Sequence, residues 1–294
     1  MKKVLLSLII VLFGTANAAT IVPVVWGFAL ASTSGLMARE IVDEANNIQK
    51  KYVFVLESKP GAGGSVSVNY TTSLSQPAIL IHSSSYFIRP NMFAEGWYDV
   101  KQFNILNNFC NGQAIAFISK NYKTLYELQK QKSFSIGVLP GSITQLLVSE
   151  YQKQFTNQDI VIVGYKDTPQ MTNQVLGGFL DIGIDWLAGV NNKELNVLAV
   201  TGKHNHPGAK TFTLQGIAGF EDMTADFYLM VNKNMNSETV KEFNDIMTKA
   251  VDNKRIKDLC MQDFGEPANV TGAAAAEIFK RKEIYWKLAV EKTK

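Results

Sequence analysis

Short apolar runs alternate with segments of helical pattern through most of this chain, and this alternation constrains the fold more than any other feature. The runs at residues 20–25, 52–56 and 78–81 are each followed by a loop of glycine or short polar residues. Apolar residues then recur at helical spacing, as in residues 36–48. Strands that alternate with helices predict a mainly parallel α/β sheet. Ligands of such sheets bind at the carboxyl ends of the strands, where these loops fall.

A second set of the same units follows in the middle of the chain. Apolar runs at 134–138, 160–163 and 180–184 again precede or follow segments of helical pattern. A later run at 227–231 is a strand that returns from this second set. With no low-complexity linker, we expect the chain to cross between two α/β lobes more than once, forming a hinge. The predicted lobes comprise residues 19–110 with 228–294, and residues 111–227.

The N-terminus has the pattern of a secretory signal peptide. Two lysines precede an apolar run at residues 4–13, and Ala16-Asn17-Ala18 is a small-x-small cleavage site. The apolar run is too short to span a bilayer. Residues 1–18 are therefore predicted to be removed after Ala18, which leaves an exported, periplasmic protein.

The charge balance argues against polyanionic partners. Loss of Lys2 and Lys3 with the signal peptide lowers the formal net charge from +3 to +1. A nearly neutral chain has no basic field that would recruit nucleic acid or an anionic membrane. We expect no nucleic-acid partner, and we expect a monomer.

The chain has two cysteines, Cys110 and Cys260. In an oxidising compartment a disulfide between them would persist and would join the C-terminal part to the first half. Two buried free thiols agree with the sequence equally well, because sequence cannot place two cysteines within bonding distance.

A glycine-rich loop at residues 59–65 is the first candidate for a binding site. Three of the four residues 61–64 are glycine, so backbone N–H groups there can approach a ligand closely. The helix expected just beyond adds unpaired N–H donors that suit a carboxylate or phosphate. A tight turn without a ligand is equally consistent with these seven residues. The glycine spacing excludes a dinucleotide fingerprint, because Val66 occupies a required glycine position, and it excludes a Walker loop.

Enzymatic motifs are absent from the sequence. The three histidines, His82, His204 and His206, are not in metal-binding spacing with the cysteines. No Gly-x-Ser-x-Gly elbow occurs. We therefore expect no metal, no cofactor and no catalytic residue.

Four motifs together resemble the Bug/TctC family, the periplasmic solute receptors of tripartite tricarboxylate transporters. They lie at residues 59–65, 164–169, 176–181 and 198–201, in the family's order. The resemblance implies a type II periplasmic-binding-protein fold, in which two lobes close by hinge motion on a small carboxylate. It also implies that the glycine loop grips one carboxylate end of the ligand.

Two departures from the family pattern indicate a divergent member. The first strand-to-helix loop keeps only Phe28 of the family motif, and Gly35 stands where the family carries an aspartate. Asp167 replaces the glycine of the family's Tyr-Lys-Gly-Thr motif. A carboxylate near the cleft would disfavour a second anionic group on the ligand. We therefore expect a ligand that differs from the family's usual di- and tricarboxylates.

The candidate ligand-binding residues are loop residues at the ends of the predicted strands. The hydroxyls of Ser83, Ser84 and Ser85 can donate hydrogen bonds to a carboxylate, although a solvated serine-rich turn is the alternative. For Asp185, a structural ion pair or helix cap agrees with the sequence as well as ligand contact does. The full set of expected ligand contacts is Phe28, Ala31, Ser32, Gly61, Ala62, Gly63, Gly64, Ser83, Ser84, Thr144, Thr168 and Asp185.

These features together predict an extracytoplasmic solute-binding protein. It would capture a small carboxylate-bearing metabolite and present it to the membrane subunits of a tripartite tricarboxylate-type transporter. Two alternatives have different functions: a ligand-sensing partner of a membrane histidine kinase, and a periplasmic enzyme.

Overall fold

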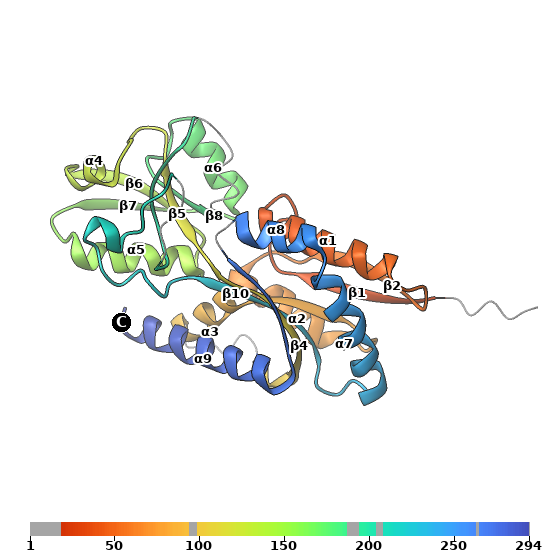
Figure 1. Cartoon of the computed structure of the whole chain (residues 1–294). Coiled ribbons are helices and arrows are strands. Elements are labelled where there is room, and N and C mark those ends of the chain that lie inside the picture. Colours follow the sequence, from red (N-terminus) through yellow and green to blue (C-terminus); the bar gives the residue numbers. More distant parts are fainter. Residues whose placement is uncertain (1–18, 94–98, 187–193, 204–207, 263–264, 294) are drawn as a thin grey trace, which may run out of the picture.

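A computed structural model describes residues 19–93, 99–186, 194–203, 208–262 and 265–293 (Figure 1). The predicted signal peptide lies outside the described residues. Among the described residues, no helix is long and apolar enough to cross a membrane. The helices of these segments are α1 (Thr33–Asn47), α2 (Ser65–Ser73), α3 (Ile88–Met92), α4 (Leu125–Gln129), α5 (Ile143–Gln154), α6 (Thr168–Leu176), α7 (Ser237–Val251), α8 (Lys254–Gln262) and α9 (Gly272–Glu291).

The larger lobe is built on a six-stranded sheet of order β11-β4-β10-β3-β1-β2. Its strands are β1 (Thr20–Trp26), β2 (Tyr52–Ser58), β3 (Ile79–Ser83), β4 (Phe103–Gln113), β10 (Ala225–Asn232) and β11 (Glu266–Thr271). Strand β1 pairs in parallel with β2 and β3, whereas β10 is antiparallel to β3 and β4, and β11 is antiparallel to β4. The prediction of a mainly parallel sheet is therefore wrong for half of this sheet. Strand β10 arrives directly from the other lobe, without the crossover helix that parallel pairing requires.

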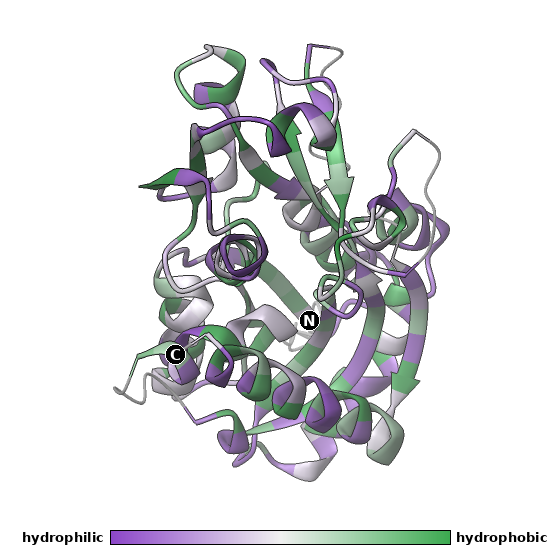
Figure 2. Cartoon of the chain, turned by 90° about the vertical axis from the view of Figure 1, so that its left-hand side faces the viewer, coloured by the Kyte–Doolittle hydropathy of each residue, from purple (hydrophilic) through white to green (hydrophobic). Residues whose placement is uncertain are grey.

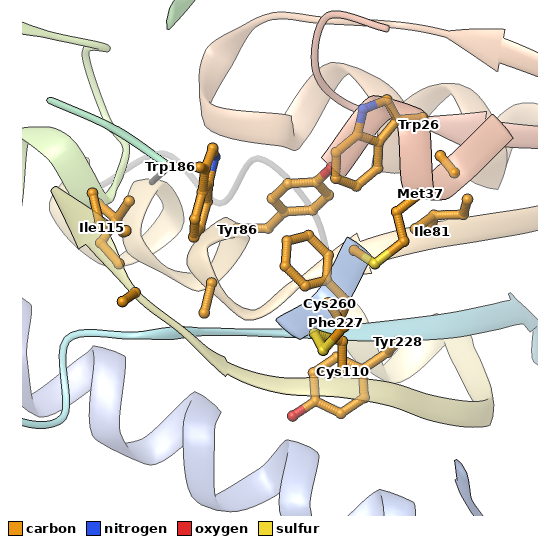
Figure 3. Packing of buried hydrophobic residues seen from close by; sticks show 14 of the residues in the cluster. Trp26, Met37, Ile81, Tyr86, Cys110, Ile115, Trp186, Phe227, Tyr228 and Cys260 are labelled. Carbon is orange, nitrogen blue, oxygen red and sulfur yellow. A yellow bond between two sulfur atoms is a disulfide. The ribbon is translucent and has the colours of Figure 1, made fainter. Parts of the chain in front are cut away.

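Helices cover both faces of the six-stranded sheet. Figure 1 shows α1 and α8 on one side and α3 and α9 on the other. Alternation along β3 explains this, because successive side chains of a strand point to opposite faces. Ile81 packs in the core near Met37 of α1 (Figure 3), while the His82 ring lies 5.3 Å from the Phe279 ring of α9. Figure 2 shows the hydrophobic strands between these more polar helices.

Strand β4 was not predicted, and its polar composition explains why. Asn107 and Asn108 are fully buried within it, although asparagine disfavours strands. Asn108 Nδ2 donates a hydrogen bond to the Phe227 carbonyl at 3.1 Å, and Asn107 Nδ2 donates to Asn269 Oδ1 at 2.6 Å. Pairing with the neighbouring strands therefore outweighs the local preference of these residues.

The smaller lobe contains two short sheets and the helices α4, α5 and α6 (Figure 1). One sheet has the order β8-β5-β9, and the other pairs β6 with β7 in parallel. A parallel bridge between Ile136 and Ile182 links the two. The strands are β5 (Ile115–Ser119), β6 (Ser133–Val138), β7 (Asp159–Gly164), β8 (Gly183–Trp186) and β9 (Asn196–Val200).

The chain passes between the lobes where β4 leads into β5 and where β10 begins. The predicted boundaries fall within these strands, since β4 and β10 remain paired as far as Gln113 and Ala225. We propose that the lobes divide near these two positions. The two crossings lie side by side, as expected of a hinge.

Asp226 connects the two crossing strands. Its side chain is almost fully buried, and its Oδ1 accepts a hydrogen bond from the Gly112 N–H at 2.8 Å. Lys282 Nζ of α9 lies 3.6 Å from the same oxygen, and the Tyr228 hydroxyl donates to Oδ2 at 3.4 Å. The Asp226 N–H donates in turn to Ser84 Oγ at 3.0 Å. One carboxylate thus holds β4, β10 and α9 together at the crossing.

Cys110 and Cys260 form a disulfide between β4 and α8, with their Cα atoms 5.9 Å apart. This decides between the two alternatives that the sequence left open. Figure 3 shows the bond beside Phe227 and Tyr228 of β10. It joins residues 150 positions apart in the sequence, so it closes a loop that contains the whole smaller lobe.

We predict that reduction of this disulfide lowers the free energy of unfolding by about 2–5 kcal/mol, because the reduced unfolded chain gains the entropy of a long open loop. Urea denaturation with and without a thiol reductant measures the change. The Cys110→Ala/Cys260→Ala double variant is the control, since the chain has no other cysteine. A reductant effect of equal size in that variant would contradict the assignment.

We also predict that Asp226→Ala lowers the free energy of unfolding by about 2 kcal/mol, because it removes the acceptor of the Gly112 N–H and the partner of Lys282. Asp258→Ala is the matched control. Its partner Lys254 has an 87% exposed side chain, so its loss should cost less than about 0.5 kcal/mol. Equal losses in the two variants would argue against a structural role of Asp226 at the crossing.

Candidate functional site

A cavity of about 340 Å³ lies between the two lobes. This is within the usual size range of small-molecule sites. Both lobes contribute to its wall. The larger lobe supplies Phe28, Ala29, Ser32, Ser34, Pro60, Gly61, Ala62, Gly63, Ser85 and Arg89, and the smaller lobe supplies Ile115, Leu139, Pro140, Ser142, Ile143, Thr144, Tyr165, Lys166, Asp167, Thr168, Ile184, Asp185 and Trp186.

The N-termini of helices from both lobes converge on this cavity. Ser32 caps α1 by accepting from the Gly35 N–H at 3.1 Å. Ser142 caps α5 by accepting from the Thr144 N–H at 3.2 Å, and Asp167 caps α6. The first N–H groups of a helix have no carbonyl partner within the helix, and the helix dipole is positive at this end. The convergence therefore favours an anionic ligand.

The glycine loop enters the cavity with an unusual backbone. Gly61, Ala62, Gly63 and Gly64 all have positive φ, at 132°, 48°, 61° and 99°. Ala62 is the one described residue other than glycine with positive φ, a conformation that costs about 1 kcal/mol or more in an L-residue. The short helix η1 (Ala62–Gly64) lies within this loop. Turns of this kind orient successive N–H groups toward a common point, where an anion can bind.

The two lobes touch through backbone atoms at this loop. A Cβ atom on Gly63 would lie 2.5 Å from the Gly141 carbonyl oxygen of the smaller lobe. Gly141 itself lies against Arg89, whose Nη1 is 3.5 Å from the Pro140 carbonyl oxygen. The structure thus shows the lobes in contact over the cavity, with no space for a side chain at Gly63.

Most of the predicted ligand-binding residues line the cavity. Those that line it are Phe28, Ser32, Gly61, Ala62, Gly63, Thr144, Thr168 and Asp185. Ala31, Gly64, Ser83 and Ser84 do not.

The two serines are turned into the larger lobe. Ser83 Oγ accepts from the Ser85 N–H, which caps the short helix η2 (Ser84–Phe87). Ser84 Oγ accepts from the Asp226 N–H at the hinge. Both side chains are fully buried, and of the three serines Ser85 alone reaches the cavity wall.

Gly64 and Ala31 are displaced for different reasons. Gly64 precedes α2 and faces the Tyr86 ring, where an added Cβ atom would overlap ring carbons. Its role is therefore close packing inside the larger lobe. Ala31 is exposed to solvent outside the cavity lining. The nearby Gly35 has no room for a side chain, since a Cβ atom there would lie 2.6 Å from the Ala29 carbonyl oxygen, so this loop cannot carry the family's aspartate without rearrangement.

Several lining residues were not in the predicted set, among them Ser34, Arg89 and Trp186. Arg89 lies one turn beyond the serine-rich segment. A helix predicted after Ser85 would have brought Arg89 to the side of these serines, but no helix was predicted there. Trp186 follows Asp185 directly and is 8% exposed, with its ring centroid 6.0 Å from that of Phe227. Figure 3 shows its indole between Ile115 and Tyr86.

Asp185 is the buried carboxylate of the site. It is the last residue but one of β8, with 7% of its surface exposed, and it accepts hydrogen bonds from the Trp186 N–H at 2.7 Å and from Thr172 Oγ1 at 3.0 Å. Burial raises the pKa of Asp185 to about 6, and its hydrogen bonds oppose this shift. The sequence left two interpretations of Asp185 open, a structural ion pair or helix cap and a ligand contact. Within the described residues, this side chain forms no ion pair and caps no helix.

His82 lies outside the cavity. It is fully buried among Tyr86, Phe87 and Phe279, and burial lowers its pKa to about 3. A neutral, enclosed imidazole cannot exchange a proton with a ligand in the cleft. His204 and His206 lie outside the described residues.

We predict that Gly63→Ala prevents full closure of the lobes, because the added methyl group would collide with the Gly141 carbonyl oxygen. Gly178→Ala is the matched control, since Gly178 also has positive φ, 73°, but has open space around its Cα. Both variants should lose about 1 kcal/mol of stability from the strained backbone. Small-angle scattering should show a larger radius of gyration for Gly63→Ala alone, and equal radii would show that the contact does not limit closure.

Comparison with known proteins is informative at the level of solved structures. No protein-family model and no curated protein sequence matches the chain. The periplasmic binding protein BugD is similar at 18% identity and a TM-score of 0.83, with 93% of this chain and 97% of that chain covered.

Two further similar structures carry ligands. R. palustris Rpa4515 with adipate matches at 17% identity and a TM-score of 0.81, covering 93% of this chain and 97% of that chain. MatC from Rhodopseudomonas palustris with bound malate matches at 14% identity and a TM-score of 0.79, covering 93% and 99%. The chain therefore has the α/β fold of the Bug/TctC-type periplasmic binding proteins.

Proposed function

We propose that this chain is an exported solute-binding protein of the Bug/TctC family, which captures a small carboxylate-bearing metabolite. One observation carries the proposal: helix N-termini from two lobes converge on a single cavity between them. Each helix N-terminus offers N–H donors and the positive end of a helix dipole. Together these termini stabilise a carboxylate better than any neutral group.

The energetics fit reversible capture. A carboxylate that accepts three or four charge-assisted hydrogen bonds, at roughly 1.5 to 3 kcal/mol each, can offset the costs of association and retain about −8 kcal/mol, a micromolar affinity. The donors available include the glycine loop N–H groups and the hydroxyls of Ser85 and Thr144. Reversible capture needs no covalent chemistry, so we propose a binding protein and not an enzyme.

The similar structures support the carboxylate assignment. Rpa4515 holds adipate and MatC holds malate in the same fold. His82 lies outside the cavity and so cannot act there as a general base, which supports a binding role over the enzyme alternative.

The closed contact between Gly63 and Gly141 supports a transport role. A ligand that binds both lobes stabilises the closed state, and a membrane partner can recognise that state by its shape. We therefore propose that the loaded protein, as a periplasmic monomer, docks on the membrane subunits of a tripartite tricarboxylate-type transporter.

We predict that the mature protein, purified without unfolding, carries a carboxylic acid that native mass spectrometry detects as an added mass. After the ligand is stripped by unfolding and refolding, the identified acid should raise the Tm, and at about 100 times its Kd it should stabilise the fold by about 2.7 kcal/mol. A retained ligand without a carboxyl group would overturn the carboxylate assignment.

Uptake of the identified acid in a deletion strain separates transport from sensing. Loss of uptake supports the transporter role. Unchanged uptake together with altered gene expression would instead support the histidine-kinase partner.

A further inference from the structure

The cavity distinguishes between the two ends of its ligand. We infer that the ligand carries one carboxylate, an apolar body and, at the far end, a cationic ammonium-type group that Asp185 binds. The inference rests on the proposed function, because it assumes that a carboxylate occupies the glycine loop and the N-termini of α1 and α5, while Asp185 lies beside Thr168 at the N-terminus of α6. It deepens that function by naming the class of ligand and one residue that selects it.

Part of the cavity wall is apolar. Side chains from both lobes form this part of the wall: Phe28, Ile115, Leu139, Ile143, Ile184 and Trp186. Most of them are buried, and Phe28 packs edge-on against Trp26 and Tyr86 in the larger lobe. A citrate-like ligand would place charged or hydroxyl groups against these side chains, where they would lose hydration without gaining a partner. An alkyl or aryl body fits this wall.

Asp185 lacks a cationic partner. Every hydrogen bond that it accepts comes from a neutral donor, either the Trp186 N–H or a threonine hydroxyl. In the part of the chain that the structure describes, no lysine, arginine or histidine forms an ion pair with it. A carboxylate that is 93% buried normally pairs with a cation, because neutral donors compensate its charge only in part. Since Asp185 lines the cavity, the ligand itself can supply that cation.

The other charged groups of the cavity lie on different elements. Arg89 belongs to α3 of the larger lobe and lies near the glycine loop and Gly141, where it adds to the positive potential of the carboxylate end. Lys166 and Asp167 lie in the loop between β7 and α6, and Lys166 is exposed. The elements packed against Asp185 are β5, β6 and α6, and they contain no titratable side chain. Asp185 is therefore the buried anion of the smaller lobe's wall.

Three probes of equal chain length test the inference, because they differ only at the far end. Adipate ends in a second carboxylate, caproate in a methyl group and ε-aminocaproate in an ammonium group. Titration calorimetry on the stripped mature protein at neutral pH should give the lowest Kd for ε-aminocaproate. The Kd for caproate should be about tenfold higher, and that for adipate should be higher again. Adipate binding as tight as that of ε-aminocaproate would overturn the inference.

Asp185→Asn tests whether the charge of Asp185 causes this preference, because asparagine has nearly the shape of aspartate and carries no charge. This variant should lose the preference for ε-aminocaproate over caproate and should bind adipate more tightly than the parent does. Asp159→Asn, at an exposed position of the same lobe, should leave all three Kd values unchanged. An unchanged preference in Asp185→Asn would overturn the role of this residue.

The pH dependence gives a second readout. Because the pKa of Asp185 is about 6, its carboxylate becomes ionised as the pH rises through this value. Relative to Asp185→Asn, which records only the titration of the probes' own carboxyl groups, the affinity of the parent for ε-aminocaproate should therefore rise between about pH 5 and about pH 7, and that for adipate should fall. Opposite trends would overturn the inference.

Failure of this inference is distinguishable from failure of the proposed function. If none of the three probes binds at millimolar concentration, the inference is overturned, whereas the carboxylate role is still decided by the mass of the retained ligand. A retained dicarboxylic acid would likewise overturn the inference and support the broader function.

Discussion

The approach of one backbone to another across the cleft is the constraint on which the rest of the site depends. Gly63 lies so close to the Gly141 carbonyl oxygen that neither loop can carry a side chain at the contact. This contact limits how closely the two lobes approach each other at the cleft, whose wall includes helix N-termini from both lobes. The positive φ angles of residues 61–64 follow from the same requirement, because only such a turn brings bare peptide groups to the front of the loop.

The crossing between the lobes differs from the contact at Gly63, because side chains and not backbone atoms hold its strands together. Asp226 connects the crossing strands to α9 through hydrogen bonds and a partly buried ion pair, and the disulfide fixes β4 to α8 nearby. These connections all lie on the side of the larger lobe. The crossing is thus held by side chains, whereas the cleft brings two backbones together at Gly63 and Gly141.

The sequence predicted the parts of this design that depend on local patterns. Strands β1 to β3 and the helices α1 and α2 were predicted to within a few residues, because apolar periodicity decides them. Strand β4 was missed because its asparagines are stabilised by partners more than 100 residues away, such as Phe227. In the site, the glycine loop was found from its composition, whereas the direction of Ser83, Ser84 and Ser85 depends on the rotation of the chain as β3 ends. Arg89 reaches the cavity through the fold of η2 and α3, which no short motif specifies.

The position of the disulfide in the chain has a consequence for the order of assembly. Cys260 follows the entire smaller lobe in sequence, so a chain that emerges from its N-terminus exposes Cys110 long before its partner. The larger lobe cannot be covalently fastened until nearly the last strand and helix have appeared. The smaller lobe, which has no cysteine of its own, reaches its shape by packing alone, with no covalent link inside it.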